Sequence, residues 1–250
     1  MTSSQLRTNA REALNGKWGK AALLSLVYAL ITFVISFVLK FIPFVGSILQ
    51  FVISVPLSYG LLVTFIKLKR DEEVSYTDFV TTGFNSFGKV WAVFGNMVLK
   101  LIIPIVLVIL SIILMVYGGI GTGVGIAFSS ASATAGFSGL LIVGLILYFA
   151  SIIYLVVKGY YYSLAYYLLY DNSDKTGKEI VEESEKLMNG NRWNFFWLGL
   201  TFIGWAILSA FTLYIGLLWL IPYIMVTFVC FYESLLETKD SEKIDPIEEK

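Results

Sequence analysis

The residues with the clearest chemical promise are two lysines inside long apolar runs, Lys100 and Lys158. If a helix opens at Trp91, Lys100 lies roughly 13–14 Å along its axis, close to the midplane of a ~30 Å hydrocarbon core. If the next helix ends at Tyr170, Lys158 lies roughly 18 Å from that end. A lysine without a partner at the bilayer centre costs at least about 2.5 kcal/mol, and no acidic residue is available at that depth. An anionic ligand such as a lipid phosphate is therefore the sharpest hypothesis for this pair.

Polar residues near Lys100 follow a helical spacing. Asn85, Lys89, Asn96 and Lys100 recur at intervals that place them in one stripe on a helix. The candidate anion- or lipid-binding set is therefore Lys89, Asn96, Lys100 and Lys158.

An alternative start and end of the spans would remove these lysines from the bilayer centre. If the third span begins at Leu101 and the fourth ends at Val157, Lys100 and Lys158 are ordinary residues at the inner membrane boundary. Long lysine side chains also reach the interface from within a span.

Several kinds of chemistry are excluded by composition. The chain has no histidine, which excludes a histidine base, a Ser-His-Asp triad and a histidine-ligated metal. The single cysteine, Cys230, lies in an apolar run and reads as a core residue. The formal net charge is zero, with no basic stripe for nucleic acid. We expect no enzyme activity, catalytic residue, cofactor, metal site or nucleic-acid partner.

One carboxylate lies near the inner end of the last apolar run. Glu233 could carry protons or pair with Arg192 or Lys20, and the simplest reading is a hydrated residue at the membrane edge.

The elements that hold these residues are predicted to be transmembrane helices. Hydrophobic residues make up 57% of the 250, only 14% are charged, and mean hydropathy is +0.78. Soluble domains carry roughly a quarter charged residues, and a spanning helix needs about 20 apolar residues. The sequence therefore predicts an all-α bundle with six spans at roughly 20–39, 43–66, 90–117, 139–169, 193–212 and 215–236.

The distribution of basic residues predicts the orientation. With the N-terminus in the cytoplasm, all of the 18 lysines and arginines except Lys40 and Lys100 fall on or near the inner side. We therefore expect a multi-pass protein of the cell membrane with both termini cytoplasmic.

A threefold repeat organises the predicted bundle. Amphipathic segments end at Asn15-Gly16 and Asn189-Gly190, each followed by a tryptophan that opens a span. The prediction is a single transmembrane domain, 1–236, made of three units of interfacial helix plus hairpin, 1–70, 71–173 and 174–236. A charged, disordered cytoplasmic tail is expected over 237–250.

Two prolines and one glycine-rich segment modify the spans. Pro56 and Pro222 lie inside the second and sixth spans, where each removes a backbone donor and is a candidate kink. We favour a kink that serves helix packing over one that serves a gate.

Residues 118–139 are rich in Gly, Ser, Ala and Thr, which predicts a flexible outer loop.

Motifs near the C-terminus resemble a known family. They are Met188-Asn189-Gly190, Phe202-Ile203-Gly204-Trp205 and Phe231-Tyr232-Glu233, with Gly16-Lys17-Trp18 and the run 55–60 near the N-terminus. Together they resemble the bacterial six-span family catalogued as domain of unknown function number 975. The resemblance implies a multi-pass architecture and bacterial origin but no activity.

Two function classes follow. The first is a non-enzymatic accessory, scaffold or anionic-lipid-binding protein whose partners are membrane lipids and a membrane protein or a second copy of itself. The alternative is a transporter or channel for small solutes or lipids, with a path lined by Lys100 and Lys158.

Overall fold

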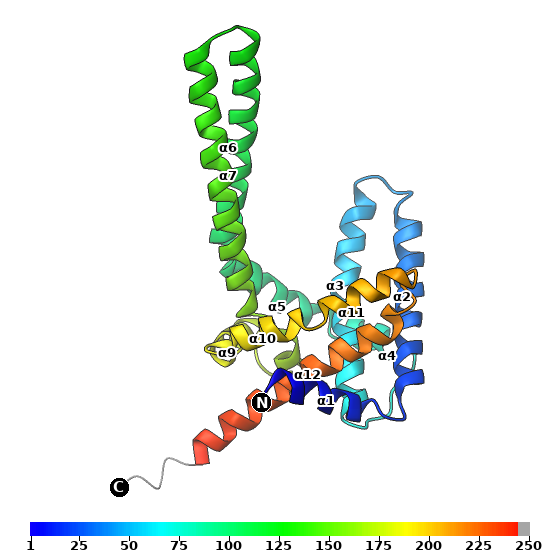
Figure 1. Ribbon diagram of the computed structural model, residues 1–250. Coiled ribbons are helices and arrows are strands. Elements are labelled where there is room, and N and C mark those ends of the chain that lie inside the picture. The colour runs from blue at the N-terminus through cyan, green and yellow to red at the C-terminus, as the bar shows by residue number, and fades with distance from the viewer. Residues whose placement is uncertain (245–250) are drawn as a thin grey trace, which may run out of the picture. The chain divides into compact units, whose positions relative to one another are not determined.

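The computed structural model describes residues 1–244 and is built from helices, with no strand among these residues (Figure 1). The elements are α1 (Ser3–Ala13), α2 (Trp18–Leu39), α3 (Val45–Lys69), α4 (Asp78–Asn85), α5 (Phe87–Lys100), α6 (Ile102–Ala127), α7 (Ala131–Tyr160), α8 (Ala165–Asp171), α9 (Gly177–Met188), α10 (Arg192–Leu200), α11 (Ile203–Phe211) and α12 (Leu217–Ile244). Six stretches are long and apolar enough to cross a membrane: 18–39, 45–69, 102–127, 131–171, 192–211 and 217–239. The predicted all-helical class with six such stretches is confirmed.

The described chain forms two compact units. One contains Met1–Phe94 with the residues from Leu164 onward, and the other contains Gly95–Ser163. The second predicted repeat, 71–173, is therefore divided between the two units.

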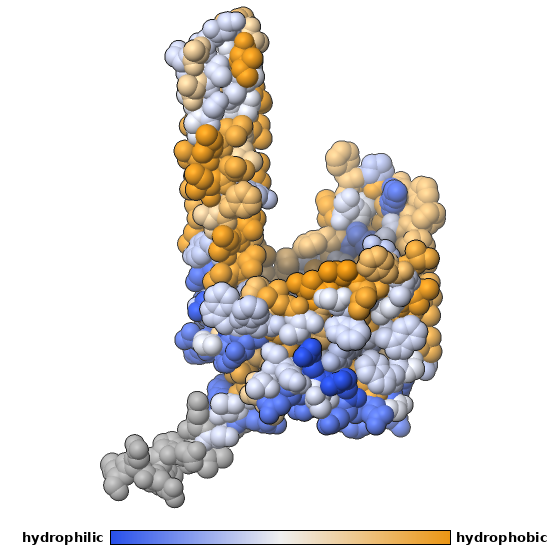
Figure 2. Space-filling model, in the orientation of Figure 1, coloured by the Kyte–Doolittle hydropathy of each residue, from blue (hydrophilic) through white to orange (hydrophobic). Residues whose placement is uncertain are grey.

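The smaller unit is dominated by a long hairpin of α6 and α7. Exposed apolar side chains cover its shaft, as the orange surface in Figure 2 shows, while its tip is paler. The predicted loop over 118–139 is wrong, because α6 continues to Ala127 and α7 starts at Ala131. The small residues instead let the helices approach closely. A Cβ on Gly118 would lie 2.9 Å from Leu141 Cα, and one on Gly125 would lie 2.7 Å from the Thr134 amide nitrogen.

In the larger unit, α2 and α3 form a hairpin against which α4 packs. The approach of α3 and α4 is possible because two glycines face backbone atoms. A Cβ on Gly83 would meet the carbonyl of Pro56, and a Cβ on Gly60 would meet the carbonyl of Phe79. Phe79 is fully buried at this contact.

Helix α12 crosses the end of the α2–α3 hairpin at which α2 begins and α3 ends. Lys17, just before α2, donates to the Leu68 carbonyl near the end of α3 at 2.9 Å, so these two ends are adjacent. On α12, Tyr223 contacts Trp18 with ring centroids 6.1 Å apart, while Glu233 pairs with Lys69. Those two α12 residues lie roughly 15 Å apart along the helix axis. The helix therefore passes across this end of the hairpin.

The amphipathic helices α1 and α9 bury the faces that their sequences predict. Leu6 and Ala10 are buried on α1. On α9 the buried face consists of Ile180, Val181, Leu187 and Met188 together with the polar Ser184. Each helix starts with a capping box, from Thr2 with Gln5 and from Thr176 with Glu179. The predicted stops have glycines at positive φ, 75° at Gly16 and 82° at Gly190.

Other boundaries differ from the prediction. The fifth apolar stretch breaks into α10 and α11 around Thr201, whose hydroxyl donates to the Leu198 carbonyl at 2.7 Å. The predicted disordered tail, 237–250, begins inside α12, so residues 237–244 are helical, and 245–250 lie outside the described residues.

Candidate functional site

The two candidate lysines lie at the base of the α6–α7 hairpin, away from its turn. Lys100 is the last residue of α5, and α6 starts two residues later at Ile102. Lys158 lies in the last turn of α7, with its ammonium 5.4 Å from the Tyr161 ring centroid. The start of α6 at Ile102 matches the alternative in which Lys100 precedes the third span, whereas Lys158 lies inside α7 and inside the apolar stretch 131–171. A continuous helix from Trp91 through Lys100 into the span is not formed.

The hairpin register places the two lysines at the same level. Facing residues are nearly equally far along the chain from Ser129 in the turn, as the contacts of Gly121 with Phe137 and Gly125 with Thr134 show. Lys100 and Lys158 are exactly equally far from Ser129 in sequence. The register therefore gives the two lysines a similar level along the hairpin, and their depth in a bilayer stays a prediction.

The rest of the predicted polar stripe is only partly on one helix. Asn85 ends α4, and a break at Ser86 separates it from α5. Lys89, Asn96 and Lys100 share α5, but the Lys89 ammonium donates to the Ser173 carbonyl at 2.9 Å. Lys89 therefore holds the segment after α8.

Both candidate kink prolines lie inside continuous helices. Pro56 is a buried residue of α3, and Pro222 lies in the second turn of α12. The Pro56 carbonyl packs against Gly83. This contact connects Pro56 to the packing of α4.

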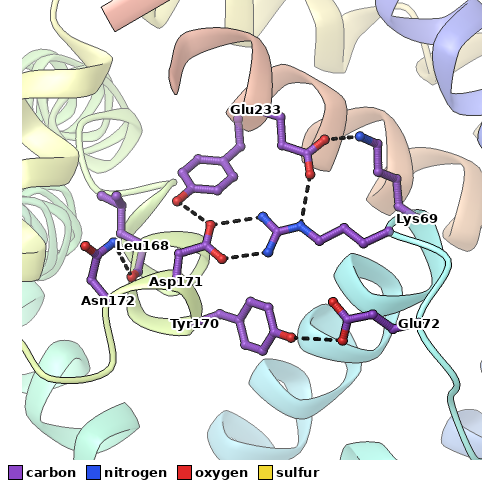
Figure 3. Close-up of polar contacts among 9 residues, drawn as sticks. Lys69, Glu72, Leu168, Tyr170, Asp171, Asn172 and Glu233 are labelled. Atoms are coloured by element: carbon purple, nitrogen blue, oxygen red, sulfur yellow. Dashed lines mark hydrogen bonds and ion pairs between the residues drawn. The ribbon is translucent and has the colours of Figure 1, made fainter. Parts of the chain in front are cut away.

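A cluster of four charged side chains joins the ends of α3 and α8 to the middle of α12 (Figure 3). Arg70, which caps α3, donates two parallel hydrogen bonds to Asp171 at the end of α8, at 2.7 and 3.0 Å. Its Nε donates to Glu233 of α12 at 3.1 Å, and Lys69 pairs with the other oxygen of Glu233. We call Lys69, Arg70, Asp171 and Glu233 the Arg70 cluster.

Tyrosines complete the Arg70 cluster. The fully buried Tyr232 donates its hydroxyl to Asp171 at 2.9 Å, and the Arg70 guanidinium lies 5.7 Å from the Tyr170 ring centroid. Tyr170 in turn donates to Glu72 at 3.4 Å. Each carboxylate of the cluster thus accepts hydrogen bonds from a cationic side chain, and Asp171 also accepts one from the phenol of Tyr232.

The charge balance of the Arg70 cluster favours a structural role. Two cations and two carboxylates sum to zero. The hydrogen bonds to Asp171 raise the pKa of the Arg70 guanidinium above its ordinary value, with a further contribution from Glu233, although burial opposes them. Bidentate pairing of this kind fixes geometry as well as charge. Both carboxylates are engaged, and the arrangement locks the end of α3 to α8 and α12.

A second charged group joins α9 to α12. Glu183 accepts from Lys175 at 2.6 Å and from Lys239 at 3.3 Å. Burial alone would raise the pKa of the Glu183 carboxyl, but these hydrogen bonds outweigh it and the pKa is lowered. Stability from this group is therefore present near neutral pH.

The sequence pointed to the wrong partners for Glu233 and did not single out Arg70 or Asp171. Glu233 pairs with Lys69 and Arg70 rather than with Arg192 or Lys20. A usable signal was present, because charged residues end the second, fourth and sixth apolar runs, and inner ends of spans can meet at one level. Cys230 is buried, in agreement with its assignment to the core.

Comparison with known proteins gives a family without a described activity. No curated protein and no solved structure matches the chain. A family model described as protein of unknown function (DUF975) matches residues 1–239, which is nearly all of the sequence. The helices described above, six of them long and apolar enough to cross a membrane, agree with the architecture that the resemblance implied. The chain therefore belongs to the DUF975 family of proteins of unknown function.

Proposed function

We propose that this chain is a non-enzymatic integral membrane protein that binds anionic lipid headgroups at the base of the α6–α7 hairpin. In this role it acts as an accessory or scaffold for a membrane partner. The observation that carries the proposal is the matched register of Lys100 and Lys158 at the ends of two long apolar helices.

The length of the hairpin supports a headgroup-level site. Helix α6 has 26 residues and α7 has 30, which correspond to about 39 and 45 Å. A hydrocarbon core is about 30 Å thick, so the lysine-bearing base can lie among headgroups while the shaft crosses. Each lysine near an anionic surface contributes about 1 kcal/mol to lipid attraction.

The pairing of charged side chains in the larger unit supports the proposal that the protein is not an enzyme. The carboxylates of the Arg70 cluster are held by cations, and Glu183 is held by two lysines. A catalytic acid or base needs a proton-transfer path to a substrate, and these groups instead join helices.

The orientation is part of the proposal. We propose the cell membrane as location, with both termini cytoplasmic, on the strength of the basic residues near α1, α3, α9 and α12. A cytoplasmically active reporter fused after Lys250 should be functional, and a reporter active only outside the cell should be silent. The reverse result would overturn the orientation.

Lipid selection in nanodiscs tests the headgroup site. Wild-type protein in mixed phosphatidylglycerol and phosphatidylethanolamine discs should retain phosphatidylglycerol in native mass spectrometry. Loss of both lysines in Lys100→Ala/Lys158→Ala removes about 2 kcal/mol, so the preference should fall about 30-fold. Lys178→Ala is the matched control, because that side chain is exposed on α9 in the other unit. Equal retention by the double variant and the control would refute the site.

The transporter alternative stays a prediction. A path lined by Lys100 and Lys158 needs both side chains within the bilayer, whereas the start of α6 at Ile102 favours the boundary. Solute flux in proteoliposomes that disappears in the double variant would favour transport over the proposal.

A further inference from the structure

A cavity of about 420 Å³ opens between α1, α2, α11 and α12 of the larger unit. Its walls are mainly apolar and include four aromatic side chains, Trp18 from α2, Trp205 from α11, and Trp219 and Tyr223 from α12. Arg11 of α1 also lines it. Binding pockets for small molecules typically have volumes of roughly 300–1,000 Å³ and are mostly apolar with a few placed polar groups.

The hydroxyl groups in the wall are already satisfied within the protein. Ser209 donates to the Trp205 carbonyl at 2.9 Å, and Thr212 donates to the Ser209 carbonyl at 2.8 Å. Thr212 also accepts from the Gly216 amide at 2.9 Å. These groups need no ligand, so they leave the wall effectively apolar.

Arg11 differs from these wall residues because its charge is not balanced. Its guanidinium donates to the Thr8 hydroxyl at 3.3 Å, and it forms no ion pair among the side chains that the structure describes. Guanidinium groups match phosphate oxygens in a bidentate geometry. The part of the cavity lined by Arg11 is therefore complementary to a phosphate.

The position of the cavity favours a ligand that comes from the bilayer. Trp18 is the first residue of a stretch that can cross the membrane, and tryptophans are enriched at membrane–water interfaces. Trp205 and Trp219 remain 55% and 48% exposed in the chain alone, so an apolar occupant would still bury much of both rings. Tyr223 is held in place within the lining, because its ring packs edge-on against Phe202 with the ring centroids 5.3 Å apart.

We propose that this cavity binds one phospholipid of the bilayer, with an acyl chain between the tryptophans and the phosphate at Arg11. The site is separate from Lys100 and Lys158, which lie in the other unit, and it does not rest on the function proposed above. The occupant is defined by an apolar chain joined to an anionic phosphate.

Quenching of tryptophan fluorescence tests the site in the full chain. The probe is phosphatidylglycerol with brominated acyl chains, titrated into detergent-solubilised protein that retains the three tryptophans of the cavity. Phe replaces the tryptophans that do not line it, Trp91, Trp193 and Trp197. Quenching should saturate. A charge-assisted hydrogen bond contributes about 1.5–3 kcal/mol, so Arg11→Ala should weaken the apparent affinity at least about tenfold.

Matched variants and probes make the outcome decisive. Arg7→Ala removes an arginine from the same helix that does not line the cavity and should bind as the parent does. Lys100→Ala/Lys158→Ala should also leave this quenching unchanged, which separates the two sites. Brominated diacylglycerol, which lacks phosphate, should bind weakly, and its affinity should be the same for the parent protein and for Arg11→Ala.

Three results would overturn the proposal. They are quenching that does not saturate, equal effects of Arg11→Ala and Arg7→Ala, and displacement of brominated phosphatidylglycerol by oleate at equal concentration. The last would assign the cavity to free amphiphiles rather than to a bilayer phospholipid. Because the Arg11 side chain is exposed, we expect Arg11→Ala to keep the fold, and thermal unfolding of each variant checks this.

Discussion

Replacement of Arg70 by methionine should destabilise the larger unit through loss of charge pairing. Methionine keeps much of the apolar stem but removes three charge-assisted hydrogen bonds. Breaking a fully buried pair costs about 3–5 kcal/mol, and breaking an exposed one costs about 0–1 kcal/mol. The Arg70, Asp171 and Glu233 side chains are 28%, 22% and 18% exposed, so we expect a loss of about 2–3 kcal/mol.

The assay is thermal unfolding in detergent, followed by tryptophan fluorescence at a fixed scan rate. On the scale of soluble domains of 150–250 residues, 1 kcal/mol shifts Tm by about 2–4 °C, so Arg70→Met should lower Tm by about 4–12 °C. A double-mutant cycle with Asp171→Asn should give a coupling energy of about 0.5–3 kcal/mol.

The matched control is Lys178→Met. Its ammonium lies 4.0 Å from Glu182, and both side chains are exposed, so the loss should stay within about 0.5 kcal/mol. If Arg70→Met had the same Tm as this control, or if the double-mutant cycle showed no coupling energy, the Arg70 cluster would not stabilise the fold and the reasoning would fail.

Three further predictions concern packing and charge. Gly83→Ala should lower Tm by several degrees, because its Cβ would meet the Pro56 carbonyl, whereas Gly88→Ala, with nothing within 4 Å of its Cβ, should not. In the hairpin, Gly125→Leu should weaken the α6–α7 contact in a cysteine cross-linking assay, and Gly123→Leu, which faces open space, is the control. Glu183→Gln should be less stable than wild type at pH 7. Because the pKa of Glu183 is lowered in the fold, that difference should persist above about pH 4.5 and shrink as the pH falls below it, as Tm measurements across pH would show.

The sequence predicted the apolar helices well because length and composition decide them. The buried faces of α1 and α9 also followed from periodicity, since Leu6 and Ile180 recur with their neighbours at helical spacing. Gly16 and Gly190 marked helix ends because both adopt positive φ.

The predictions were wrong or incomplete where a residue's role depends on which distant segment it contacts. Glycine and serine over 118–139 are typical of a flexible loop, but the same small residues allow two apolar helices to approach closely, as Gly118 and Gly125 of α6 approach α7. Arg70 could not be assigned to Asp171 and Glu233, because pairing over sequence separations of 101 and 163 residues depends on which helix ends meet.

The Arg70 cluster also imposes an order on biogenesis. Synthesis proceeds from the N-terminus, so Lys69 and Arg70 are made first, Asp171 follows about a hundred residues later, and Glu233 comes last. A nascent chain that stops before Glu233 leaves Lys69 without its carboxylate and Arg70 with one acid instead of two. The α6–α7 hairpin contains none of these residues and can form while the ribosome is still translating α12. Closure of the cluster is therefore a late assembly step, and truncated translation products cannot complete it.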